Sequence, residues 1–93
     1  MIIGSFQIHL HLPMSHSLKE KRGYIKGMIQ KLIRKYNVSM SEIDNHDDWQ
    51  YATLGMATVS NDKSIIENTF RKVLDEIEAT DGIELETYLE EYL

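Results

Sequence analysis

Seven basic side chains lie close together between positions 18 and 36, and together they have the chemistry of a phosphate-binding surface. Only one acid, Glu20, lies in this segment, so it carries +6 in a chain whose formal net charge is −5. Lysine and arginine contacts to phosphates give binding that weakens steeply with salt. An RNA backbone is therefore one predicted ligand, and an ordinary solvated helix face is the alternative. The seven residues are Lys19, Lys21, Arg22, Lys26, Lys31, Arg34 and Lys35.

A pair of histidines is the second group with possible chemistry. His9 and His11 are two residues apart, so on a strand they point to the same face and could bind a divalent metal together with Glu84 or Glu86. Two histidines are a weak metal signal, and cross-strand His–Glu hydrogen bonds are the preferred interpretation. The acidic loop at 44–48 lacks a calcium-loop pattern and favours a turn. We therefore expect no metal or other cofactor.

The sequence contains no recognisable catalytic constellation. A glycine-rich phosphate loop, a nucleophile elbow and paired carboxylates with an evident pocket are all missing from the pattern. Catalysis needs such groups to converge at one place. We therefore expect a noncatalytic protein.

Size and composition predict one small intracellular domain. The 93 residues are 42% hydrophobic, which suits a single core over residues 1–93. Cysteine is absent and no signal-peptide pattern is visible, which fits a reducing compartment. The apolar runs are far shorter than the roughly 20 residues that span a bilayer. A cytoplasmic location without membrane contact is the expectation.

The basic residues are expected to lie on a helix, and a capping motif in the sequence marks where that helix begins. Ser17 and Glu20 have the S-x-x-E spacing of a capping box, so the helix should begin near Leu18. Ser15 and His16 precede it and could help bind a phosphate at the helix N-terminus, although capping and loop packing are the preferred interpretation. One apolar arc should pack on a sheet. The arc comprises Leu18, Ile25, Met28, Ile29, Leu32 and Tyr36.

The remaining elements follow from the period of the apolar residues. Alternation over residues 2–12 predicts a strand that Pro13 ends. Residues 38–43 predict a weaker strand whose pattern requires a bulge. This strand should form a hairpin with the strand after it. Ser60, Asn61 and Asp62 should open a second helix with a single apolar stripe. The later strands are expected at residues 38–43, 49–59 and 83–92.

The order β-α-β-β-α-β predicts an α+β, ferredoxin-like sandwich, with two helices on one face of a four-stranded antiparallel sheet in the order 4-1-3-2. Few aromatic residues are expected on the central strands of the open face, which disfavours base stacking. Burial of that face in a homodimer is the preferred interpretation. The residues expected on this face are His9, His11, Tyr51, Thr53, Glu84, Glu86, Tyr88 and Tyr92, of which both histidines and the three tyrosines are the dimer candidates.

Several short segments, taken together, resemble the YlxP-like family of small bacterial proteins of undefined function. The resemblance implies a ferredoxin-like fold, a tendency to dimerise, and a gene often found near those of translation initiation and ribosome-binding factors. It implies no catalytic residues. The segments are His-Leu-Pro at 11–13, Ser-His-Ser-Leu-Lys-Glu-Lys-Arg at 15–22, Asn-Val-Ser at 37–39, Asp47 with Trp49-Gln50, Ala-Thr-Leu-Gly at 52–55 and Val-Ser-Asn-Asp at 59–62.

These observations predict a noncatalytic homodimer whose basic helix docks on ribosomal RNA or a ribosomal subunit. Two alternatives stay open. The basic helix could meet an acidic protein instead of RNA, or the two histidines could bind a metal or a small molecule.

Overall fold

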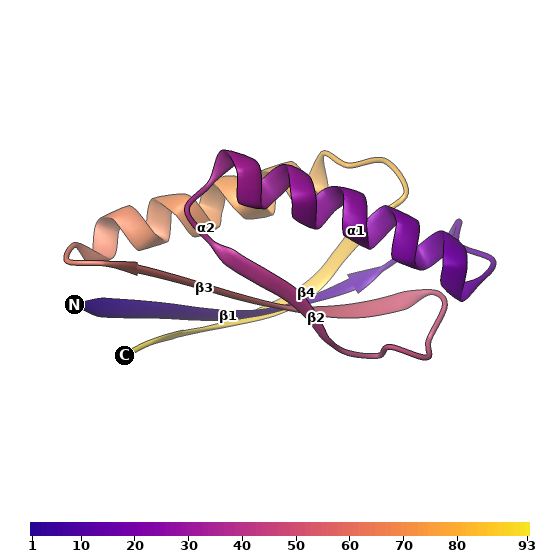
Figure 1. Ribbon diagram of the computed structural model, residues 1–93, viewed down its shortest axis with the longest axis horizontal. Coiled ribbons are helices and arrows are strands. Elements are labelled where there is room, and N and C mark those ends of the chain that lie inside the picture. Colours follow the sequence, from indigo (N-terminus) through magenta and orange to yellow (C-terminus); the bar gives the residue numbers. More distant parts are fainter.

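The computed structural model describes residues 1–93 and contains six elements in the predicted order. The strands form one antiparallel sheet in the order β2-β3-β1-β4, and both helices cover the same face of it (Figure 1). The ferredoxin-like α+β prediction is therefore confirmed. The elements are β1 (Ile2–His11), α1 (Leu18–Lys35), β2 (Ser39–Asp44), β3 (Tyr51–Ser60), α2 (Lys63–Glu78) and β4 (Glu84–Tyr92).

The core lies between the sheet and the two helices. Alternate residues of β1 and β3 point toward the helices, as the period of two predicted. The rings of Phe6 in β1 and Phe70 in α2 stack with centroids 3.9 Å apart at the centre of this layer. The opposite sheet face has no covering layer (Figure 1). The buried residues include Phe6, Ile8, Leu10, Ile25, Leu32, Leu54, Met56, Ile66, Phe70, Val73 and Ile77.

The start of α1 at Leu18 is confirmed, with a small difference in the cap. The Ser17 hydroxyl accepts a hydrogen bond from the Glu20 amide at 3.1 Å, as in a capping box. The Glu20 carboxylate accepts instead from the amide of His16 at 2.7 Å, one residue before the N-cap. Ser15 is buried, and its hydroxyl donates to the Ser17 carbonyl at 3.1 Å. Ser15 and His16 thus shape the loop that leads into the helix.

A bulge in β4 reverses the face on which most of this strand's side chains lie. Leu85 pairs with Leu10, but Thr87 pairs with His9, so Glu86 is an extra residue without a partner on β1. A one-residue shift moves every later side chain to the other face. Leu89 consequently lies on the open face instead of in the core.

The same bulge makes the prediction for two tyrosines wrong. Tyr88 and Tyr92 lie on the helix-covered side of the sheet and not on the open face. The ring of Tyr88 meets Phe70 edge-on at 5.3 Å, and that of Tyr92 meets Phe6 edge-on at 6.0 Å. These aromatic contacts extend the core toward the edge strand, so neither tyrosine is available to a partner on the open face.

The bulge predicted in the second strand is confirmed. The register between β2 and β3 shifts between Glu42 and Asp44, which leaves Ile43 as the extra residue. The Ile43 side chain lies over Gly55 on the open face. Glu42, which pairs with Leu54, points toward the helix layer, where it can meet a side chain from α1.

Candidate functional surface of helix α1

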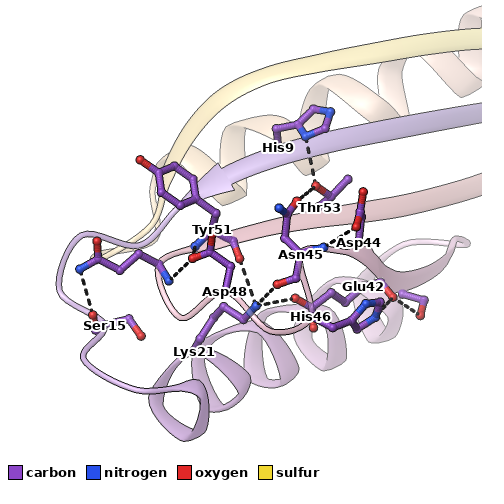
Figure 2. A network of polar contacts seen from close by, with 12 residues as sticks. His9, Ser15, Lys21, Glu42, Asp44, Asn45, His46, Asp48, Tyr51 and Thr53 are labelled. Atoms are coloured by element: carbon purple, nitrogen blue, oxygen red, sulfur yellow. Dashed lines mark hydrogen bonds and ion pairs between the residues drawn. The ribbon is translucent and has the colours of Figure 1, made fainter.

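One of the seven basic residues is part of the protein interior. The Lys21 side chain is fully buried, and its Nζ lies 3.0 Å from Oε2 of Glu42 (Figure 2). The ammonium also donates to the backbone carbonyl oxygens of Asn45 at 2.6 Å and Tyr51 at 3.0 Å. The prediction that Lys21 contacts a phosphate is therefore wrong. Three acceptors inside the protein replace the water that an exposed lysine would bind.

The acceptors around Lys21 come from β2 and from the loop between β2 and β3. Glu42 Oε2 is buried and has no partner with hydrogen-bond geometry, so its contact with Lys21 is an ion pair. Asn45 has a φ of 63°, in the left-handed region that asparagine tolerates better than most residues. Lys21 thus ties the first turns of α1 to this loop.

A chain of hydrogen bonds continues from this loop to the open face of the sheet. The Thr53 hydroxyl donates to Asn45 Oδ1 at 2.5 Å, and His9 Nδ1 lies 3.1 Å from the same hydroxyl (Figure 2). Because the hydroxyl has only one proton, His9 must donate through Nδ1. His9 is therefore held by a threonine and not by a glutamate.

His11 makes the cross-strand contact that the sequence predicted. Its Nδ1 lies 3.5 Å from Oε2 of Glu84, and its ring stacks on Tyr51 with centroids 4.7 Å apart. The structure brings no group of three or more His, Asp or Glu side chains into a position to hold a metal ion. Neither helix is both long and apolar enough to cross a membrane.

Two further basic residues of α1 are paired with an acid of α2. Lys31 and Lys35 place their ammonium groups 3.7 and 3.1 Å from the carboxylate of Glu76. The Tyr36 hydroxyl donates a hydrogen bond to the same carboxylate. This hydrogen bond, together with the nearby Lys35 and Lys31, holds the pKa of Glu76 below its usual value, and Glu76 in turn raises the pKa of Tyr36.

The lowered pKa of Glu76 predicts a pH dependence of stability. A carboxyl whose pKa is lower in the folded state adds stability above its unfolded pKa of about 4.3 and loses it as the pH falls through the folded value. Tyr36→Phe, which removes the hydrogen bond, should therefore lower the free energy of unfolding at pH 7 but much less at the acid end. Urea denaturation of both proteins from pH 7 down to the acid end measures how this loss of stability changes with pH. A loss that is the same at every pH would contradict the role given to the hydrogen bond between Tyr36 and Glu76.

Four basic residues remain exposed without a carboxylate partner, and we call them the basic ridge. They comprise Lys19, Arg22, Lys26 and Arg34. At about 100° per residue, Lys19, Lys26 and Arg34 project away from the sheet, whereas Arg22 leans toward β2. Gly23 and Gly27 lie between them, and an added Cβ at either position would meet nothing within 4 Å. The two glycines therefore leave open space between the cations of the ridge.

Some residues of this region were not foreseen from the sequence. Glu42 and Asn45 hold Lys21, and the Gln50 amide donates to the carbonyl of Ser15 at 3.1 Å, which joins the second hairpin strand to the loop before α1. One feature of the sequence does indicate that Lys21 is buried. Lys21 precedes Ile25 by four residues, so it lies on the apolar side of the helix, where a charge requires a partner.

Comparison with known proteins places this chain among proteins without an assigned function. A family model described as "Protein of unknown function (DUF503)" matches residues 3–89. The chain is also 40% identical over 68 residues to the "Uncharacterized protein YlxP" of Bacillus subtilis (strain 168), a match that covers 73% of this chain and 74% of that protein. The predicted resemblance to YlxP-like proteins is therefore confirmed, and it brings no functional residues.

Proposed function

Because the chain belongs to the DUF503 family of unknown function, we propose its role from its own surface: a noncatalytic cytoplasmic module that docks on RNA, such as that of a ribosomal subunit, through the basic ridge. The observation that carries this proposal is that four exposed cations on one helix form no ion pair with a carboxylate. Unpaired cations are free to replace the counterions of phosphates.

The number of free cations sets the expected strength of the salt dependence. Each phosphate contact contributes about −0.7 to −0.9 to the slope of log affinity against log salt, so four contacts give about −3. Raising the salt from 50 to 200 mM should then weaken binding by roughly 50- to 150-fold. Seven contacts would give a slope of about −5 to −6, so a measured slope near −3 would favour binding by the ridge alone, without the buried Lys21 and the paired Lys31 and Lys35.

Cosedimentation with purified ribosomal subunits over a salt series tests this proposal. Lys26→Glu combined with Arg34→Glu should weaken binding by more than about tenfold, because it reverses half of the ridge. The matched control is Arg71→Glu with Lys72→Glu, the same charge change at exposed positions on α2. Absence of binding at low salt, or equal losses in the two double variants, would refute the proposal.

A groove beside the ridge favours an acidic protein as the second candidate partner. It has a volume of about 460 Å³ and lies between α1 and β2, with apolar walls from Ile25 and Ile29 and cations at Arg22 and Lys26. Glu42 also lines it, but the carboxylate of Glu42 is paired with the buried Lys21. Apolar walls with a charged rim suit a protein side chain better than a phosphate. Nuclease treatment separates the candidates, since a complex held by protein contacts should survive it.

A further inference from the structure

Strand β4 forms one edge of the sheet, and no strand lies on its outer side. Next to its end, Leu93 exchanges two backbone hydrogen bonds of 2.9 Å with Ile3 of β1. In an antiparallel ladder, such hydrogen-bonded pairs alternate with pairs whose N–H and C=O groups point away from the partner strand. Every second residue of β4 therefore directs its backbone groups outward, where nothing pairs with them. These outward residues are Tyr88, Glu90 and Tyr92.

The β4 edge suits a further strand better than the β2 edge at the other side of the sheet. β2 covers only Ser39–Asp44, and its register shifts between Glu42 and Asp44. Short length and a bulge are features that protect an edge from pairing. In β4 the bulge lies near the start, at Glu86, so residues 87–92 keep a regular register with β1. The later part of β4 is thus a straight template for an extended segment.

A pocket of about 180 Å³ lies beside this edge, between β4 and α2. The α2 residues that line it recur at spacings of three and four, so they share one face of the helix. A residue added directly opposite Glu90 would direct its side chain to the same side of the sheet, which is the side that α2 covers. That side chain would enter the pocket. The lining residues are Glu67, Phe70, Arg71, Leu74, Tyr88 and Glu90.

The charges in the pocket favour a basic side chain. Glu67 and Glu90 are exposed and form no ion pair within the chain. Glu90 accepts one hydrogen bond from the Tyr92 hydroxyl at 3.1 Å. Arg71, the one cation that lines the pocket, donates to Asn68 Oδ1 at 3.2 Å on its own helix. Two carboxylates are thus free to bind an incoming cation.

The apolar part of the pocket suits the stem of a lysine or arginine. The Phe70 ring is buried, and the Tyr88 ring, which meets it edge-on, is 44% exposed. Long basic side chains place their methylene groups against such surfaces while the charged end reaches polar groups or water. A lysine or arginine would therefore fill the apolar part and extend its charge toward Glu67 and Glu90.

The charge of the whole strand points to the same partner chemistry. β4 contains four glutamates and no basic residue. A basic segment is attracted to such an edge, whereas an acidic one is repelled. The basic ridge does not interfere, because α1 packs on β2 at the other side of the sheet and α2 packs on β4. The four glutamates are Glu84, Glu86, Glu90 and Glu91.

We propose that the β4 edge binds an extended basic segment of a partner protein, which adds as a further strand antiparallel to β4 and places a lysine or arginine in the pocket beside α2. Backbone hydrogen bonds to the outward groups of β4 provide affinity, and the pocket provides selectivity, as in other cases of strand addition. In this direction, the residue opposite Glu90 exchanges backbone hydrogen bonds with it and also directs its side chain into the pocket. The binding does not depend on what the ridge binds.

A synthetic peptide tests the backbone pairing. The probe is a capped peptide of about seven residues in which lysine alternates with valine, long enough to cover the regular part of β4. Fluorescence anisotropy should give a dissociation constant below about 100 μM. Methylation of the lysine backbone nitrogens, which face β4, should weaken binding by at least about tenfold. Methylation of the valine backbone nitrogens, which face away, is the control and should have little effect. Equal effects of the two methylated peptides would overturn the proposal.

Amide hydrogen exchange locates the peptide on the protein. In the free chain, the outward amides of Glu90 and Tyr92 should exchange quickly, whereas those of Leu89 and Glu91, which bond to β1, should exchange slowly. The peptide should slow exchange at Glu90 and Tyr92 by at least about tenfold. Unchanged exchange there would overturn the proposal. Slow exchange that appears without peptide as the protein concentration rises would mean that a second copy holds this edge, which would also overturn it.

Charge reversal in the pocket tests the selectivity for a basic side chain. Glu67→Lys combined with Glu90→Lys should raise the dissociation constant of the peptide by at least about tenfold, because both carboxylates that meet its lysine are replaced by cations. Asp47→Lys combined with Glu78→Lys is the matched control, with the same charge change at exposed positions that do not line the pocket. Equal losses in the two double variants, or equally tight binding of a peptide with glutamate in place of lysine, would overturn the proposal.

Discussion

Replacing Lys21 with methionine is expected to lower the free energy of unfolding by about 3–5 kcal/mol. Methionine keeps most of the apolar stem but removes the ammonium, which leaves the buried carboxylate of Glu42 without its counter-charge and the carbonyl oxygens of Asn45 and Tyr51 without their donor. A buried acceptor that loses its partner costs its full desolvation free energy. Chemical denaturation followed by circular dichroism at pH 7 measures the loss.

A second substitution separates the ion pair from packing. Adding Glu42→Leu to Lys21→Met removes the unpaired carboxylate, so the double variant should be more stable than Lys21→Met alone. Lys26→Met, an exposed position of the same helix, is the control and should change stability by less than about 0.5 kcal/mol. A Lys21→Met loss no larger than that of Lys26→Met would contradict the burial of Lys21.

The period of the apolar residues was enough to predict the helices and strands. It was not enough to predict which side of every strand faces the core. The alternation in β1 and the Ser17 cap of α1 are local signals, and both hold in the structure. In β4, apolar residues occupy both parities, with Leu85 and Leu89 on one and Tyr88 on the other. Which of these parities faces the core depends on the bulge at Glu86. The bulge itself depends on how β4 pairs with β1, and the sequence of β4 alone does not show that pairing.

The basic residues of α1 show the same limit of prediction from local sequence. The sequence identified the basic helix, but not which cations are free. Lys21 is neutralised by Glu42, and Lys35 by Glu76, each of which is more than twenty positions away in the chain. Ion pairs between distant elements follow from the fold and not from local spacing, so the basic ridge could be defined only after the strands and helices were assembled.

Two glycines of this chain should respond to alanine with opposite signs. At Gly4, on β1, an added Cβ would lie 2.5 Å from Cγ2 of Ile66, a core residue of α2. Since this contact is far shorter than carbon atoms allow, Gly4→Ala must displace the helix or the side chain, at a cost of about 1–3 kcal/mol. At Gly27, an added Cβ meets nothing within 4 Å, so Gly27→Ala should raise the stability of α1 by about 0.8–1 kcal/mol.

The cause of the Gly4 effect can be isolated with Ile66→Ala, which removes the Cγ2 atom. Ile66→Ala alone should cost about 2–5 kcal/mol, because it leaves a cavity in the core. In that background, Gly4→Ala should cost much less than in the wild type, since its methyl group can occupy the vacated space. Urea denaturation of the four variants of this cycle gives the coupling free energy. Additive losses would show that the close approach of α2 to β1 is not what requires glycine at position 4.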